Sequence, residues 1–129
     1  GRGGNECILL VEDDAEVRTL ARRILEGEGY RVLAAGDGKE AIELATRHAA
    51  DLDLLLTDVV LPGLNGRQIA EAVVKIRPGL SVIFMSGYTD DVIAERGVLE
   101  PGLRFLHKPF TIPSLLTAIH EALRESHRS

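Results

Sequence analysis

Five short apolar runs alternate along the chain with segments in which apolar residues recur at helical spacing. The runs lie at residues 8–11, 32–35, 54–56, 82–85 and 103–106. The first, third and fourth are continuously apolar, which is typical of parallel strands covered on both faces. Between the first two runs, Val17, Leu20, Ala21 and Ile24 follow the spacing of an amphipathic helix. The pattern predicts strand and helix alternating five times.

The expected helix boundaries come from capping residues and helix breakers. Gly27 and Gly29 are expected to end the first helix. Asp37 with Glu40 resembles a capping box at the start of the second helix. The third helix is expected to end before Pro78 because the residue before proline disfavours helical geometry.

The last two predicted helices differ in strength. The fourth is short, marked by Val92 and Ile93 and ended by Gly97, whereas the last has a longer apolar stripe and Thr111 as its expected N-cap. Five alternations indicate an α/β fold, in which a five-stranded parallel sheet is flanked by five helices with right-handed crossovers. In such a sheet, chemistry takes place beyond the carboxyl ends of the strands.

Four of these strand ends carry charged or hydroxyl side chains. Glu12 and Asp13 follow the first strand, Asp58 the third, Ser86 the fourth and Lys108 the fifth. If the first and third strands are neighbours, their carboxylates converge, and two carboxylates about 4 Å apart repel by roughly 4 kcal/mol at an effective dielectric near 20. Mg²⁺ relieves such repulsion through oxygen ligands. The pattern predicts a Mg²⁺ site beside a nucleophilic Asp58, with Lys108 and Ser86 contacting phosphoryl oxygens.

Four segments together resemble the receiver domain of two-component response regulators. They are VEDD at 11–14, LTDVVLPG at 56–63, MSGY at 85–88 and KPF at 108–110. Each segment alone is weakly specific, but all four occur in order, each after the expected strand. The resemblance covers residues 7–123 and implies a flavodoxin-like sheet with strand order 2-1-3-4-5.

The resemblance also implies roles for the acidic residues at the carboxyl ends of the first and third strands. Asp58 is expected to be the phospho-acceptor and, with Asp13, a direct Mg²⁺ ligand. Glu12 is expected to act on the metal through a water molecule, and the backbone carbonyl of Val60 to be a further ligand. Glu12 stands where Asp is commoner in the family, which lengthens the side chain next to the metal.

A second set of implied roles concerns the response to phosphorylation. Ser86 and Lys108 are expected to hold the phosphoryl group, and the bond between Lys108 and Pro109 to be cis. Ser86 and Phe105 are expected to form a switch that changes the face made by the fourth helix, fifth strand and fifth helix. Phe105 replaces the frequent tyrosine of the family, so that such a switch would work by packing alone.

Two positions bear on hydrolysis of the phosphorylated form. Val60 and Tyr88 stand where the family influences attack of water on the phosphoryl group. Neither side chain is an acid or an amide that orients water well. We therefore expect slow self-dephosphorylation.

Composition limits the partners of the chain. A net charge of −5 and an aromatic content of 4% without Trp argue against nucleic-acid binding by this domain. The single Cys7 excludes an intramolecular disulfide and fits a cytoplasmic location. No apolar run approaches the roughly 18 residues that span a membrane, so no membrane contact is expected.

We expect residues 6–125 to form one receiver domain, 1–5 a linker or tag remnant, and 126–129 a C-terminal tail.

These features predict a phospho-accepting receiver that takes its phosphoryl group from a histidine kinase or phosphotransfer protein and passes the signal to a downstream protein. No substrate turnover is expected beyond its own phosphoryl group. The glycine-rich start without an initiator Met favours a piece of a hybrid sensor histidine kinase, and a stand-alone regulator is the alternative. An aspartyl-phosphate phosphatase is disfavoured because the pair Asp51 and Asp53 precedes the third strand.

Overall fold

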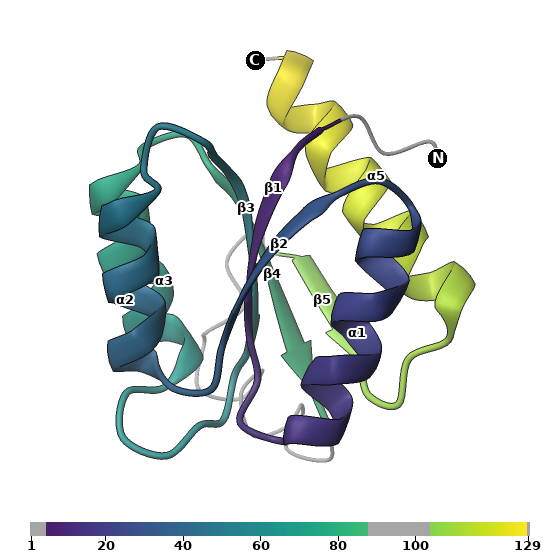
Figure 1. The fold of residues 1–129 in the computed structure, drawn as a ribbon, viewed down its shortest axis with the longest axis horizontal. Helices are drawn as coiled ribbons and strands as arrows, with labels where there is room; N and C mark the ends of the chain where they lie inside the picture. The colour runs from purple at the N-terminus through teal and green to yellow at the C-terminus, as the bar shows by residue number, and fades with distance from the viewer. Residues whose placement is uncertain (1–4, 88–103, 129) are drawn as a thin grey trace.

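A computed structural model describes residues 5–87 and 104–128 of the chain, which form a parallel sheet between two layers of helices (Figure 1). The strand order is β2-β1-β3-β4-β5, and all four pairings are parallel, as predicted. The strands are β1 (Cys7–Val11), β2 (Arg31–Ala35), β3 (Leu52–Asp58), β4 (Ser81–Ser86) and β5 (Arg104–His107).

The helices of the described residues are α1 (Ala15–Gly27), α2 (Gly38–Arg47), α3 (Gly66–Ile76) and α5 (Ile112–Arg128). The short fourth helix predicted before Gly97 lies outside the described residues. The last helix runs past residue 125 to Arg128, and the predicted domain boundaries stay predictions. Within the described part of the chain, no helix combines the length and apolarity needed to cross a bilayer.

Local sequence explains where the helices begin and end. Asp14 caps α1 by accepting hydrogen bonds from two backbone amides of the first turn. Gly29, with φ 107°, ends α1 in a Schellman motif: its N–H and that of Tyr30 donate to the carbonyls of Glu26 and Leu25. Asp37 caps α2 as predicted. These caps fix the path of the chain between the strands.

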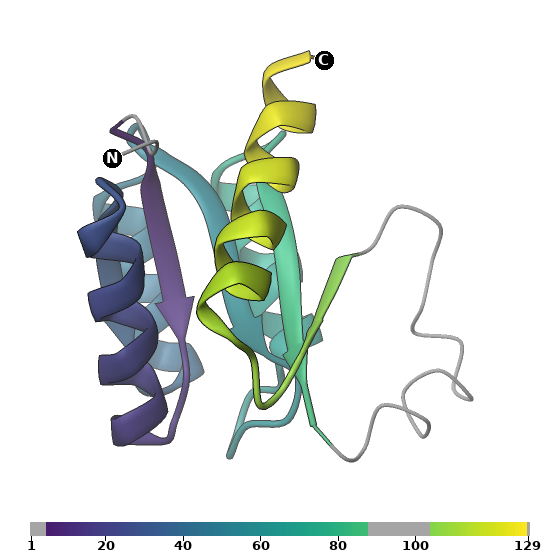
Figure 2. The same cartoon turned by 90° about the vertical axis from the view of Figure 1, so that its right-hand side faces the viewer.

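Alternate residues of each strand pack into the two helical layers. Leu9 and Leu55 belong to the cluster on the side of α2 and α3, whereas Ile8 and Leu56 belong to the cluster on the side of α1 and α5. All four side chains are fully buried. Figure 2 shows α5 lying along β4 on its face of the sheet, where the two elements are in contact. The central strands are thus held from both sides, which gives their carboxyl ends fixed positions.

Candidate functional site

The register of the central strands brings the acidic residues together. Val11 of β1 pairs with Thr57 of β3, so that Glu12 and Asp58, the next residues, lie side by side at the carboxyl edge. Oxygen atoms of Glu12, Asp13 and Asp58 lie within 4.8 Å of one another. Glu12 is fully buried, Asp58 is 8% exposed, and Asp13 is exposed. The three carboxylates converge as the sequence pattern predicts, and their individual roles stay predictions.

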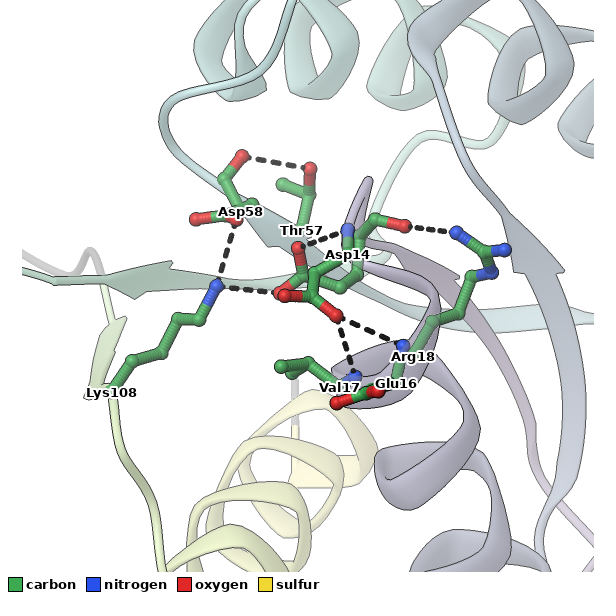
Figure 3. A network of polar contacts seen from close by, with 8 residues as sticks. Asp14, Glu16, Val17, Arg18, Thr57, Asp58 and Lys108 are labelled. Atoms are coloured by element: carbon green, nitrogen blue, oxygen red, sulfur yellow. Dashed lines mark hydrogen bonds and ion pairs between the residues drawn. The ribbon is translucent and has the colours of Figure 1, made fainter.

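Lys108 supplies the cation of this acidic cluster. Its Nζ donates to Glu12 Oε1 at 2.6 Å and to Asp58 Oδ2 at 3.0 Å (Figure 3). Partial burial of the ammonium group alone would lower the pKa of Lys108, but its hydrogen bonds to both carboxylates, together with their negative charges, outweigh burial and raise that pKa. The lysine therefore stays charged and compensates two buried carboxylates.

Both the side chain and the main chain of Glu12 are held in place. Its Oε2 accepts a hydrogen bond from the backbone N–H of Asp14 at 3.0 Å, and its Oε1 contacts Lys108. Its carbonyl oxygen accepts from Arg18 Nη1 at 2.7 Å, with Arg18 reaching back from α1 (Figure 3). Because both carboxylate oxygens already have donors, a role for Glu12 through a water molecule fits its geometry better than direct ligation.

The geometry of the acidic cluster fits a hard divalent cation. Two oxygens bound directly to one Mg²⁺ lie at most about 4.2 Å apart, given Mg–O distances near 2.1 Å. The upper bound of 4.8 Å is slightly wider, and a water molecule between one carboxylate and the ion covers the difference. Asp13, the exposed member, leaves the cluster open to solvent. Glu12, Asp13 and Asp58 can therefore hold Mg²⁺ while part of its hydration shell remains.

The loop after β3 folds closely over the backbone of Asp58. The N–H of Gly66 donates to the carbonyl of Val59 at 2.9 Å, and a Cβ at position 66 would lie 2.2 Å from the carbonyl oxygen of Asp58. Only glycine permits this approach. The buried Thr57 hydroxyl donates to the same Asp58 carbonyl at 3.0 Å. Val60 exposes 59% of its surface in this loop, and ligation by its carbonyl stays a prediction.

Ser86 lies at the end of β4, where its carbonyl accepts a hydrogen bond from the backbone N–H of Lys108 at 2.8 Å. The side chain is 2% exposed, and its hydroxyl has no hydrogen-bond partner among the described residues. A buried hydroxyl without a partner is costly, and in a functional site it is a candidate for contact with a ligand. The peptide bond between Lys108 and Pro109 is cis, as the resemblance implies.

Phe105 packs against a second aromatic ring. Its ring centroid lies 5.6 Å from that of Phe84, with 31° between the ring planes. Thr57, Phe84 and Phe105 pair across β3, β4 and β5 and form one row on the side of α2 and α3. Tyr88, expected to influence hydrolysis, lies outside the described residues. The role of Phe105 as a switch stays a prediction.

Two observations complete the site. The Asp51 and Asp53 pair, considered for a phosphatase, lies near the opposite end of the sheet, where Asp53 Oδ2 accepts from the backbone N–H of Cys7 at 2.9 Å. Arg18 and Thr57, which both support the backbone of the acidic residues, had no assigned role in the sequence. The sequence offered one signal for Arg18: it is a basic residue in the first turn of the helix that follows the acidic residues.

Comparison with known proteins decides the family. The sequence model of one protein family, the response regulator receiver domain, matches residues 8–120 of this chain. The chain belongs to this family. Its fold and the order of its strands are those that the four sequence segments predict.

Individual relatives agree with this assignment. The chain is 34% identical over 122 residues to the sensor kinase CckA of Brucella abortus, covering 95% of this chain and 13% of that kinase. It is 33% identical to sporulation initiation phosphotransferase F of Bacillus subtilis, covering 92% of this chain and 94% of that protein. A receiver domain protein from Clostridium thermocellum superposes with a TM-score of 0.85 at 28% identity, covering 95% of this chain and 98% of that one.

The relatives differ greatly in length. The chain spans 13% of the sensor kinase and about half of several transcriptional regulators that it also matches. The receiver domain is the part that these proteins share with this chain.

Proposed function

We propose that Asp58 accepts a phosphoryl group from the phosphohistidine of a histidine kinase or phosphotransfer protein, and that the domain acts as a switch in a two-component phosphorelay. One observation carries this proposal. The Asp58 carboxylate lies in an open acidic cluster with Glu12 and Asp13, 3.0 Å from the Lys108 ammonium group. A nucleophile, a cation and a candidate metal site thus meet at one point.

In the proposed reaction, an Asp58 carboxylate oxygen attacks phosphorus and forms an O–P bond. The N–P bond to the donor imidazole breaks, and its electron pair returns to the imidazole nitrogen. Lys108 Nζ compensates charge on the phosphoryl oxygens, and the Ser86 hydroxyl donates to one of them. Mg²⁺, bound by Asp13 and Asp58 directly and by Glu12 through water, would supply further neutralisation of this charge. The domain turns over no other substrate.

The proposed response to phosphorylation starts at the Ser86 hydroxyl, which is buried and has no hydrogen-bond partner among the described residues. Phosphorylation adds about −1.5 to −2 charges and new acceptor oxygens next to Asp58. The buried Ser86 hydroxyl gains an acceptor. The resulting shift of Ser86 draws β4 toward the site, and with it Phe105, which pairs with Phe84 of β4. The changed face includes β5 and α5, on which we place the downstream protein.

The wider context is a proposal of the same kind. Similarity to the sensor kinase CckA over the receiver region favours a hybrid sensor histidine kinase, in which this domain faces the cytoplasm. An antibody against the domain should then detect a native polypeptide several times larger than the 14.0 kDa of this chain. A native product close to that mass would instead favour a stand-alone regulator.

The phosphoryl acceptor can be tested by mass spectrometry. Incubation with a small acyl phosphate and Mg²⁺ should add about 80 Da, the mass of one phosphoryl group. Labelling should be lost in Asp58→Asn and strongly reduced by EDTA. Asp14→Asn is the matched control, because it removes another carboxylate of the same edge while Asn still caps α1. Labelling that persists in Asp58→Asn would assign the phosphoryl group to another residue.

The same preparation tests the switch and the lifetime of the phosphorylated form. A phosphoryl mimic bound at Asp58 should shift the backbone amide resonances of Ser86, Phe105 and α5. Unchanged resonances in β4 and β5 would contradict the switch. We expect the labelled protein to persist well beyond a few seconds, and hydrolysis within seconds would contradict the interpretation of Val60 and Tyr88.

A further inference from the structure

We propose that Arg18 is a positioning residue that fixes the main chain of the acidic loop, residues 12–14, and so sets the affinity of the site for its divalent cation. The inference rests on the proposed function, since it concerns the metal that Asp58 needs. Arg18 donates to the Glu12 carbonyl and not to Asp58. It acts through the backbone that carries Glu12 and Asp13.

The acidic loop needs such support because strand pairing ends there. The N–H of Glu12 still donates to the carbonyl of Ala35 at 3.0 Å, which continues the pairing of β1 with β2. The Glu12 carbonyl lies beyond the last paired residue, and Arg18 Nη1 donates to it at 2.7 Å. The guanidinium group therefore replaces a strand neighbour at the point where the chain turns toward Asp13.

The space for this contact is provided by a glycine. A Cβ at Gly36, just after β2, would lie 3.2 Å from Arg18 Nη1 and 3.7 Å from its Cζ. A methyl group there would be in tight contact with the guanidinium group, which would have to shift by a few tenths of an ångström. Since Gly36 is absent from the glycines of positive φ, an alanine is compatible with its backbone, and its expected effect comes from this contact.

The contact also sets Arg18 apart from its neighbour on α1. Arg22 pairs with Glu26 at 3.2 Å, and both side chains are about half exposed, at 51% and 45%. Arg22 thus carries the same charge on the same helix without a contact to the acidic loop. Both guanidinium groups repel the cation, so that loss of either charge alone would favour Mg²⁺ binding. Fixation of the Glu12 carbonyl belongs to Arg18.

Fixation of the loop has a consequence for the metal site. The Asp14 N–H donates to Glu12 Oε2, and this bond orients the Glu12 side chain toward Lys108 and the cluster. If the Glu12 carbonyl is released, the Glu12–Asp14 segment gains freedom, and Asp13 must be ordered when the ion binds. Residues that orient metal ligands from outside typically contribute a factor of roughly 10–100 in affinity.

The experiment compares wild type with Arg18→Gln, Arg18→Lys, Gly36→Ala and the matched control Arg22→Gln. Calorimetry should show Mg²⁺ affinity about tenfold lower in Arg18→Gln. Arg18→Lys keeps the charge and should lie closer to Arg18→Gln than to wild type. Gly36→Ala should lower affinity in the same direction by a smaller factor, and Arg22→Gln should bind like wild type.

A second readout uses the metal-free protein and does not depend on function. Amide exchange at Asp14 should be faster in Arg18→Gln than in wild type, and unchanged in Arg22→Gln. Equal Mg²⁺ affinity and equal exchange in Arg18→Gln and wild type would overturn the inference. An equal loss in Arg18→Gln and Arg22→Gln would also overturn it, because Arg22 makes no contact with the Glu12 carbonyl and that contact would then not be the cause. If wild type itself binds no Mg²⁺, the proposed function fails, and the exchange data still decide whether Arg18 fixes the loop.

Discussion

The two halves of the site differ in how far their polar groups are satisfied. In the acidic half, made of Glu12, Asp13, Asp58 and Lys108, the buried carboxylates share the Lys108 ammonium group, and Glu12 has a further backbone donor. In the hydroxyl half, made of Ser86 and Phe105, the buried hydroxyl has no partner among the described residues. The acidic half is therefore organised in the resting protein, whereas in the proposed function the hydroxyl half is completed by the phosphoryl group.

The support under the two halves differs as well. The carboxylates of the acidic half extend from β1 and β3, which each pair with a strand on both sides, whereas Lys108 follows β5. The hydroxyl half depends on β4 and on β5, a strand of four residues at the edge of the described sheet, with β4 as its paired neighbour. A change that starts at Ser86 meets less resistance toward β5 than toward the centre of the sheet. Phosphorylation is thus expected to leave the three carboxylates in place and to move the hydroxyl half.

The largest effect is expected from Lys108→Met. Phosphoryl labelling should slow about 100-fold, because the cation for the phosphoryl oxygens is lost. Without metal, the free energy of unfolding should fall by about 2 kcal/mol, since two buried carboxylates lose their shared partner. Urea unfolding in EDTA and in Mg²⁺ measures this loss of stability, and Mg²⁺ should stabilise the variant more than wild type.

Lys75→Met, at an exposed position on α3, is the control. Equal stability of Lys108→Met and wild type in EDTA would mean that the acidic half is not organised in advance.

A smaller effect should separate two buried hydroxyls. Thr57→Val removes a hydroxyl that donates to the Asp58 carbonyl and should cost about 1 kcal/mol of unfolding free energy. Ser86→Ala removes a buried hydroxyl without a partner and should leave that free energy unchanged or raise it by up to about 1 kcal/mol. Labelling of Ser86→Ala should nevertheless slow about tenfold, because the donor to the phosphoryl oxygen is gone.

Urea unfolding and labelling rates of the two variants check this pair. If Ser86→Ala were destabilised as much as Thr57→Val, the Ser86 hydroxyl would have a partner in the resting protein. The contrast between the two halves would then disappear.

The smallest effect concerns alkaline pH. The folded protein raises the pKa of Lys108 above 10.5, and burial raises the pKa of Tyr30 from 10.0 to about 12. Because both pKa values are raised on folding, both contributions to stability are complete below the unfolded values. Each is lost as the pH rises through the corresponding folded value.

In a Tyr30→Phe background, adding Lys108→Met should therefore flatten the loss of stability above about pH 10.5. Urea midpoints at a series of pH values measure this difference. An identical pH dependence of the two proteins would mean that the carboxylates do not raise the pKa of Lys108 on folding.

The sequence predicted the sheet and the meeting of the carboxylates because periodicity and strand ends are local signals. It underestimated the length of β3, because Asp53 is a residue type common in loops. In the structure Asp53 lies within the strand, and its side chain accepts a hydrogen bond from the Cys7 N–H. It also placed Glu40 in a reciprocal cap with Asp37, whereas Glu40 Oε1 accepts from the N–H of Gly36.

The partners in contacts made by folded-back loops could not be assigned from sequence patterns. The bond from Arg18 to the Glu12 carbonyl and the approach of Gly66 to the Asp58 carbonyl depend on how loops fold back in three dimensions. Such contacts leave no periodicity in the chain. The pairing of Lys108 with Glu12 joins residues 96 positions apart and follows only once the strand order is known.

The position of a bound Mn²⁺ ion in a crystal, located by its anomalous scattering, tests the central claim most directly. The account predicts one peak at the carboxyl edge of the sheet, at about 2.0–2.3 Å from one carboxylate oxygen of Asp13 and one of Asp58, with Lys108 Nζ moved off the ion. A peak bound by neither aspartate, or crystals saturated with Mn²⁺ that show no peak at this edge, would contradict it.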